Sequence, residues 1–197
     1  GLAGWSVAEA LRQAMPSTPI TLVSACAGDR YHKPELSIAM GKGQCAKALV
    51  AESGAEAARR LGVRLLANTL MIGLSPALHQ LRTTRGQLRY SQLILAQGAR
   101  PALPASLPAD LCWRVNHLQQ WDGLQQQLAQ RSQRVLVVGA GMIGCEMAED
   151  LARAGHQVTL LDRQAWPLAA LLPQQAGERL LQGLQDMGVQ YHGQVEV

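Results

Sequence analysis

A glycine-rich turn between two apolar runs constrains the fold of this chain more than any other feature. The apolar residues 135–138 lead into the sequence GAGMIG at 139–144, and a helical pattern follows. A second apolar run, residues 158–161, ends at Asp162. This order predicts a strand, a tight turn, a helix and a second strand, which is the unit that binds dinucleotides in parallel α/β sheets. We therefore expect an α/β fold.

Each part of the turn has its own expected role. Gly139 would permit the tight turn, Gly141 would let a pyrophosphate approach the backbone, and Gly144 would let the helix pack close to the strand. The first turn of the following helix, with Met142 and Ile143, would offer free N–H groups and a partial positive charge to the phosphates. A small-residue turn made for packing alone is the alternative, and the surrounding pattern disfavours it.

The acid at the end of the second run bears on the choice of coenzyme. Asp162 would accept hydrogen bonds from the adenosine ribose hydroxyls, and its charge would repel the 2′-phosphate of NADPH. Arg163 follows it, and an arginine near this position can accommodate that phosphate. We expect NADH, with NADPH as the less favoured alternative.

The beginning of the chain has the same layout. Gly1 and Gly4 precede a helical pattern at 6–15 and an apolar run at 20–23 that ends at Ser24. The two glycines would be the second and third of another such turn, with its first glycine and strand upstream. An ordinary glycine-containing turn remains the alternative. Ser24 stands where an acid would hold the ribose, and a hydroxyl makes a weaker hydrogen bond than a carboxylate.

The remaining pattern divides the chain. Three prolines between 101 and 108 exclude helix and strand interior and mark a linker. We place the domain boundary there and expect domains at 1–107 and 108–197. Other expected elements are helices at 44–61, 121–131 and 174–187, strands at 63–66, 91–96 and 189–192, and a hairpin at 78–90.

Composition excludes several functions. The formal net charge is +4, and no basic and aromatic stripe suggests nucleic acid. The four cysteines form no close pair, so we expect no disulfide and no metal site, and a reducing cytoplasm fits. No apolar run is long enough to cross a membrane. The chain begins without Met, and we expect a fragment that lacks both ends.

Three stretches carry a resemblance to a known family. They are GLAGW at 1–5 with TPITL at 18–22, YHKPELS at 31–37, and GAGMIGCE at 139–146 with the strand and the Leu168 to Pro173 stretch beyond it. These residues resemble the pyridine nucleotide-disulfide oxidoreductase superfamily, and within it most of all the rubredoxin–NAD reductases and the NADH reductases of flavorubredoxin. The resemblance covers essentially the whole chain. It implies two Rossmann-like three-layer dinucleotide-binding domains of the FAD/NAD(P)-binding fold, both incomplete here.

The resemblance also implies a function. FAD would bind in the first domain and NADH in the second, and electrons would pass through the flavin to a small acidic iron protein such as rubredoxin. The protein would be a monomer or a weak oligomer. Lys33 and Glu146 would act at the flavin and the nicotinamide, although an exposed lysine and a solvated carboxylate at a helix start are the plain alternatives. The residues implied to bind cofactor are Gly1, Leu2, Ala3, Gly4, Ser24, Lys33, Pro34, Met71, Gln97, Gly98, Ala99 and Glu146, besides those of the glycine turn with Asp162 and Arg163.

The chain also departs from the family pattern. The acid of the first unit is replaced by Ser24, and Ile38 stands where related oxygenase-coupled reductases carry a lysine. Without two close thiols the disulfide-reducing branch is excluded. Two alternatives stay open. One is a non-catalytic NAD-binding or redox-sensing module, and the other is a flavoprotein reductase with another acceptor, such as a ferredoxin, nitrite reductase or oxygen.

Overall fold

The computed structural model describes residues 1–196. The chain forms two compact units, one of residues 1–32 and 50–99, the other of residues 33–49 and those from 100 onwards. Residues 33–49 therefore belong with the later half of the sequence. The predicted division into domains at 1–107 and 108–197 stays a prediction.

The first unit is built on two parallel strands. Strand β1 (Thr21–Val23) pairs with β2 (Arg64–Leu66), and helices α1 (Leu2–Ala14) and α3 (Gly54–Leu61) precede them in sequence. The buried side chains of this unit are Trp5, Ala8, Ala57 and Ala58, with Leu22, Leu61, Val63 and Leu65 packed against them. The helix predicted at 6–15 and the strands predicted at 20–23 and 63–66 are confirmed within a few residues.

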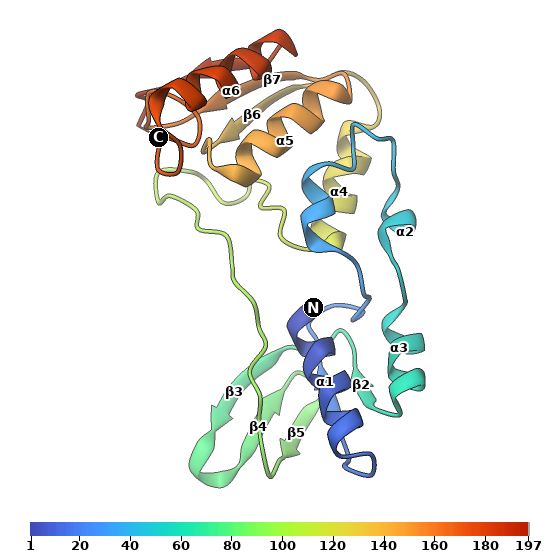
Figure 1. Cartoon of the computed structure of the whole chain (residues 1–197). Helices are drawn as coiled ribbons and strands as arrows, with labels where there is room; N and C mark the ends of the chain where they lie inside the picture. Colours follow the sequence, from blue (N-terminus) through green and yellow to red (C-terminus); the bar gives the residue numbers. More distant parts are fainter. Residues whose placement is uncertain (197) are drawn as a thin grey trace. The chain divides into compact units, whose positions relative to one another are not determined.

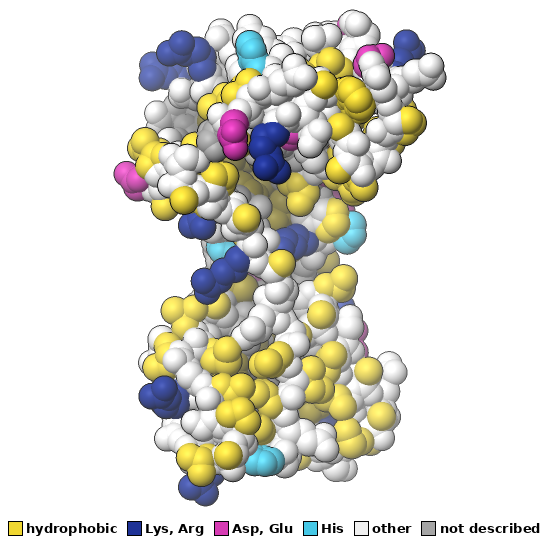
Figure 2. Space-filling model, turned by 90° about the vertical axis from the view of Figure 1, so that its left-hand side faces the viewer, with side chains coloured by type: hydrophobic (Ala, Val, Ile, Leu, Met, Phe, Trp, Pro, Cys, Tyr) yellow, Lys and Arg dark blue, Asp and Glu magenta, His cyan; other side chains and the backbone are white. Residues whose placement is uncertain are grey.

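An antiparallel sheet completes the first unit. Strand β3 (Met71–Ser75) is followed by the short 3-10 helix η2 (Pro76–Leu78) and by β4 (Gln80–Thr83) and β5 (Gly86–Arg89), and the order β3-β4-β5 is a meander. The predicted hairpin at 78–90 is thereby confirmed. Figure 2 shows hydrophobic side chains gathered on one face of this unit, and Leu70 and Ile72 beside and within β3 are 52% and 61% exposed.

Two predictions for residues 44–96 are wrong. The helix predicted at 44–61 is two helices, α2 (Ala46–Leu49) and α3, because the Ser53 side chain and Glu56 form a capping box that starts α3 afresh. Residues 91–96 do not form a strand, and Ile94 and Leu95 are more than half exposed. A strand needs a neighbour that shares its hydrogen bonds, and none of the described residues provides one here.

The second unit holds a parallel three-stranded sheet, shown with its helices in Figure 1. Strands β6 (Arg134–Val138), β7 (Gln157–Leu161) and β8 (Gln190–His192) lie in sequential order, and α5 (Met142–Arg153) connects β6 to β7. Helix α6 (Gln174–Asp186) connects β7 to β8, and α4 (Leu118–Leu128) precedes the sheet. Val158 and Leu160 of β7 are buried with Ala148 and Leu151 of α5, which gives the sheet its core. The predicted α/β class is confirmed.

A short segment from early in the sequence packs into this second unit. The 3-10 helix η1 (Lys33–Ser37) contacts both α4 and α5, and Leu36 and Ser37 are buried. Among residues 1–196, no helix combines the length and apolar character needed to span a bilayer.

Candidate coenzyme-binding site

The glycine turn has the backbone that its sequence predicts. Gly139 has φ +101°, a value that residues with a side chain rarely adopt. Its N–H donates a hydrogen bond to the carbonyl of Leu161 at 2.8 Å, which ties the turn to the end of β7. The turn therefore leaves β6 sharply and stays at the carboxyl edge of the sheet, where open α/β sheets bind their ligands.

The other two glycines differ in what surrounds them. A Cβ at Gly144 would lie 1.8 Å from the carbonyl oxygen of Gly139, so only glycine lets α5 approach the turn this closely. A Cβ at Gly141 would have no heavy atom within 4 Å, so the space beside it is open. Among residues 1–196 no side chain caps the start of α5, and Met142 and Ile143 are 60% and 69% exposed. The N–H groups of this first turn are thus available to an anion.

Asp162 is bonded to the turn itself. One oxygen of its carboxylate accepts a hydrogen bond from the N–H of Ala140 at 2.5 Å, and the other accepts one from the N–H of Gln164 at 2.8 Å. Because each carboxylate oxygen can accept two hydrogen bonds, capacity remains for the ribose hydroxyls. Arg163 beside it is exposed. Sequence reasoning expected the acid only as a ligand for the ribose and missed its role in holding the turn.

The loop after Asp162 supports the same turn from another side. The N–H of Leu168 donates to the carbonyl of Ala140 at 2.9 Å, and Pro167 is buried. Leu168 has φ +57°, which is unusual for a residue with a branched side chain. Nothing in the sequence signals that a leucine will adopt this conformation, so the contact could be found only from the structure.

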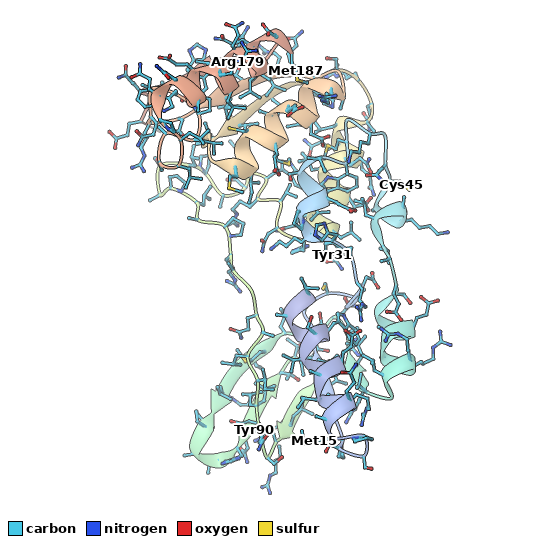
Figure 3. The ribbon with its side chains drawn as sticks, in the orientation of Figure 1. Met15, Tyr31, Cys45, Tyr90, Arg179 and Met187 are labelled. Atoms are coloured by element: carbon cyan, nitrogen blue, oxygen red, sulfur yellow. The ribbon has the colours of Figure 1, made fainter. Side chains whose placement is uncertain are left out.

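Cys145 follows the glycine turn directly, as a buried thiol. It is 6% exposed and donates to the carbonyl of Ala140 at 3.5 Å, and burial raises its pKa to about 11. Since the thiolate is the reactive form, this cysteine is a packing residue at neutral pH. All four cysteines are free, and Cys45, ahead of α2, is exposed (Figure 3).

The structure brings Lys33, Pro34 and Glu146 into one unit. The Lys33 ammonium donates to the side-chain oxygen of Asn116 at 2.5 Å. The Ser37 hydroxyl lies within hydrogen-bonding distance of both the Pro34 carbonyl, at 2.8 Å, and a Glu146 carboxylate oxygen, at 2.5 Å. The Glu146 carboxylate is therefore hydrogen-bonded, and the Lys33 ammonium is held by Asn116. The sequence pattern showed neither contact.

The expected flavin residues at the start of the chain lie at a helix N-terminus. Helix α1 begins at Leu2, with Ala3 in its first turn, and Gly1 is its N-cap with no side-chain hydrogen bond. A Cβ at Gly1 would meet nothing within 4 Å, while one at Gly4 would contact Ala96 at an ordinary 3.8 Å. The backbone N–H groups in the first turn of this helix are of the kind that bind a phosphate.

The other expected flavin residues of the first unit make local contacts. The Ser24 hydroxyl lies 3.3 Å from the Cys26 sulfur and 3.4 Å from its N–H. The Gln97 amide donates to the Met71 sulfur at 3.8 Å, and Gly98, between Gln97 and Ala99, has φ +69°. The expected flavin set includes residues of both units, and its assembly stays a prediction.

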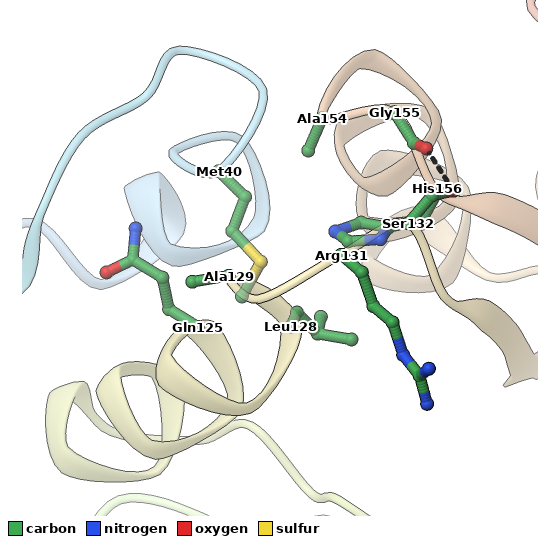
Figure 4. A pocket seen from close by; sticks show the side chains of 9 residues that line it. All are labelled: Met40, Gln125, Leu128, Ala129, Arg131, Ser132, Ala154, Gly155 and His156. Carbon is green, nitrogen blue, oxygen red and sulfur yellow. Dashed lines mark hydrogen bonds between the residues drawn. The ribbon is translucent and has the colours of Figure 1, made fainter.

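A separate cavity of about 350 Å³ lies in the second unit, and Figure 4 shows the side chains that line it. It lies at the end of the sheet opposite the glycine turn, where Ser132 precedes β6 and His156 precedes β7. The Ser132 hydroxyl donates to the Gly155 carbonyl at 2.7 Å, and the His156 ring accepts from the Gln133 N–H at 3.2 Å. Burial lowers the pKa of His156, which favours the neutral ring that can accept this bond. Within the described part of the chain, no three His, Cys, Asp or Glu side chains could together hold a metal ion.

Comparison with known proteins identifies relatives over the whole chain. The family model described as pyridine nucleotide-disulphide oxidoreductase matches residues 1–197. A nitric oxide reductase FlRd-NAD(+) reductase of Aeromonas hydrophila is 38% identical over 192 residues, which cover 96% of this chain and 48% of that protein. The protein of the same name from Klebsiella pneumoniae (strain 342) is 36% identical over 189 residues, covering 96% and 50%.

Solved structures agree with these sequence matches. A ferredoxin reductase from Rhodopseudomonas palustris superposes with a TM-score of 0.84 at 25% identity, covering 98% of this chain and 48% of that one. The covalent putidaredoxin reductase–putidaredoxin complex gives the same TM-score at 26% identity, covering 100% and 48%. The chain thus spans about half the length of the curated relatives that it matches.

Proposed function

The chain belongs to the pyridine nucleotide-disulphide oxidoreductase family, and from this premise we propose that it is the nucleotide-binding part of an FAD-dependent NADH reductase that passes electrons to a small iron protein. One observation carries the proposal most directly. The glycine turn of the second unit has open space at Gly141, an uncapped helix start beside it, and Asp162 at the neighbouring strand end. This arrangement suits a dinucleotide.

The chain's own residues would divide the work. The N–H groups at the start of α5 would bind the NADH pyrophosphate, and Asp162 would accept from the ribose. The N–H groups at the start of α1 would receive the FAD pyrophosphate. Bound FAD would supply the redox chemistry, taking a hydride from NADH and releasing electrons singly. Lys33 would hold a positive charge beside the flavin ring, and Glu146 would face the nicotinamide.

The choice of acceptor rests on the relatives. The curated matches are named for the reduction of FlRd, and the structures include reductases of ferredoxin and putidaredoxin. The chain's net charge of +4 suits an acidic partner, because opposite charges speed the encounter of electron-transfer proteins. We propose a rubredoxin-like acceptor, and a cytoplasmic location in keeping with four free thiols.

NADH in preference to NADPH is part of the proposal. The Asp162 carboxylate is held toward the glycine turn by Ala140 and Gln164, where its charge would repel a 2′-phosphate. The exposed Arg163 works against this preference, so the two residues set it together.

One observation favours a second candidate, an NAD-binding module without flavin. No carboxylate ends β1, and the Ser24 hydroxyl in its place lies against Cys26. Such a module would bind NADH through the second unit alone.

A single preparation separates the candidates. The full-length protein, purified without added cofactor, is expected to carry yellow flavin whose visible absorbance NADH bleaches under anaerobic conditions and a rubredoxin restores. NADPH serves as the matched control and should act more slowly. NADH binding by a colourless protein would favour the module instead, and flavin that NADH fails to bleach would refute the reductase.

A further inference from the structure

Two carboxylates on successive turns of helix α5 hold the segment 33–41. Glu146 is bonded to the Ser37 hydroxyl. One turn later, the two oxygens of Asp150 accept hydrogen bonds from the N–H groups of Met40 and Gly41, each at 2.8 Å. The partners of Asp150 lie more than a hundred residues away in sequence, so this contact joins two distant parts of the chain.

The Asp150 contact depends on two buried hydrogen bonds and on a glycine at position 41. Asp150 is 4% exposed, and a buried carboxylate is tolerated only when hydrogen bonds replace its water. Its two backbone donors do this, while burial raises its pKa. A Cβ at Gly41 would lie 2.7 Å from the Arg153 Cβ and 2.9 Å from an Asp150 oxygen, so only glycine permits the approach.

The segment held in this way begins with Lys33. The five residues of η1 form one short helix, within which the Ser37 hydroxyl lies 2.8 Å from the Pro34 carbonyl. The Lys33 ammonium is itself held by Asn116. The charge at Lys33 is thereby fixed relative to α5, whose first turn lies at the glycine turn.

We propose that Asp150 is a positioning residue for hydride transfer, which locks the segment 33–41 onto α5 and so fixes Lys33 relative to the NADH-binding turn. The inference rests on the proposed function. Asp150 touches neither nucleotide in this role. It acts through the segment, and rates of hydride transfer are sensitive to misplacements of this kind.

The test uses the flavin-loaded full-length protein with the substitution Asp150→Asn. The amide keeps the shape of the side chain but offers one acceptor to two N–H donors. We expect flavin reduction at saturating NADH to slow about tenfold, with the Kd for NADH changed less than about twofold, because the lost contact orders the segment and not the coenzyme. Hydrogen exchange at Met40 and Gly41 should speed up.

The matched control is Glu149→Gln on the same helix. Glu149 pairs with Arg153 at 2.8 Å, so the variant removes a neighbouring carboxylate from α5. Its flavin reduction should equal that of the wild type. If Asp150→Asn does not fold, Gly41→Ala displaces the segment from the other side, and the same slowing is expected.

The outcomes distinguish the two ideas. A wild-type flavin that NADH does not reduce overturns the proposed function and this inference with it. A different result would overturn the inference alone. If NADH reduces the flavin of a folded Asp150→Asn or Gly41→Ala variant as fast as that of the wild type, while hydrogen exchange at residues 40 and 41 is faster, the contact is only structural and the proposed function stands.

Discussion

Asp162 and Ala140 are joined by a hydrogen bond at the carboxyl edge of the sheet. The carboxylate at the end of β7 accepts from the backbone N–H inside the glycine turn at 2.5 Å. The carbonyl of the same residue, in the next peptide unit, accepts a hydrogen bond from the N–H of Leu168. The residue expected to bind the ribose therefore also fixes the turn that would bind the pyrophosphate, so the two parts of the proposed NADH site are mechanically linked.

Replacing Asp162 should change coenzyme preference. In Asp162→Ala the ribose loses a charged acceptor, and the turn loses its anchor at Ala140. We expect NADH affinity to fall about tenfold to a hundredfold, the range for a charge-assisted hydrogen bond. NADPH binding should weaken less or improve, because the repelling charge is gone and Arg163 remains. Titration with both coenzymes measures this. The control Asp162→Asn keeps an acceptor for the Ala140 N–H. An Asp162→Ala variant whose affinity for NADPH falls as much as its affinity for NADH would contradict the prediction.

Two glycines of the turn should differ in how much stability they lose on substitution by alanine. Gly144→Ala forces a Cβ into the Gly139 carbonyl at 1.8 Å, and such overpacking costs about 1–3 kcal/mol of unfolding free energy. Gly141→Ala enters open space at φ −75°, so its stability should change by less than about 1 kcal/mol. Because that space would receive the pyrophosphate, Gly141→Ala should still weaken NADH binding. Urea unfolding and NADH titration give both quantities, and equal stability losses would refute the assignment.

The cysteines should differ in reactivity. Cys45 is exposed, while burial raises the pKa of Cys145 to about 11, so almost none of it is thiolate at neutral pH. We expect iodoacetamide to label Cys45 at least about a hundredfold faster than Cys145 in the native protein. Peptide mass spectrometry follows each site. In urea the two rates should converge, and rapid native labelling of Cys145 would show that the helix start is open.

A cluster of ion pairs should make the first unit sensitive to acid. Hydrogen bonds from Arg30 and Arg60 lower the pKa of Glu9, and Arg60 lowers that of Glu52. A carboxyl group whose pKa is lowered by folding adds stability above its unfolded value, near 4.5, and loses it as the pH falls through the folded value. The free energy of unfolding should therefore decline below about pH 4.5.

The double variant Glu9→Gln and Glu52→Gln tests this. Its free energy of unfolding should depend less on pH in the acid range than that of the wild type, as measured by urea unfolding at a series of pH values. Asp110→Asn, at an exposed position in the connection between α4 and the first unit, should keep the wild-type dependence. A double variant as acid-sensitive as the wild type would remove these pairs as the cause.

Local sequence patterns predicted the strands, turns and helices whose formation depends on neighbouring residues. The apolar runs before and after the glycine turn became β6 and β7, and the glycine with φ +101° lies where the tight turn was expected. The hairpin and the later helices were also found, because their signals lie within a few residues. The strand expected at 91–96 failed for the opposite reason, since a strand exists only with a partner from elsewhere in the chain.

Sequence by itself determined the α/β class, the glycine turn and the acid that ends β7, because spacing and backbone freedom fix these over short distances. Only the tertiary structure decided that Asp162 accepts from the Ala140 N–H, that Leu168 donates to the Ala140 carbonyl, and that Asp150 holds the segment that begins at Lys33. These contacts join residues up to 110 positions apart. They follow from how buried polar groups find partners once the chain has packed, and no spacing in the sequence encodes that choice.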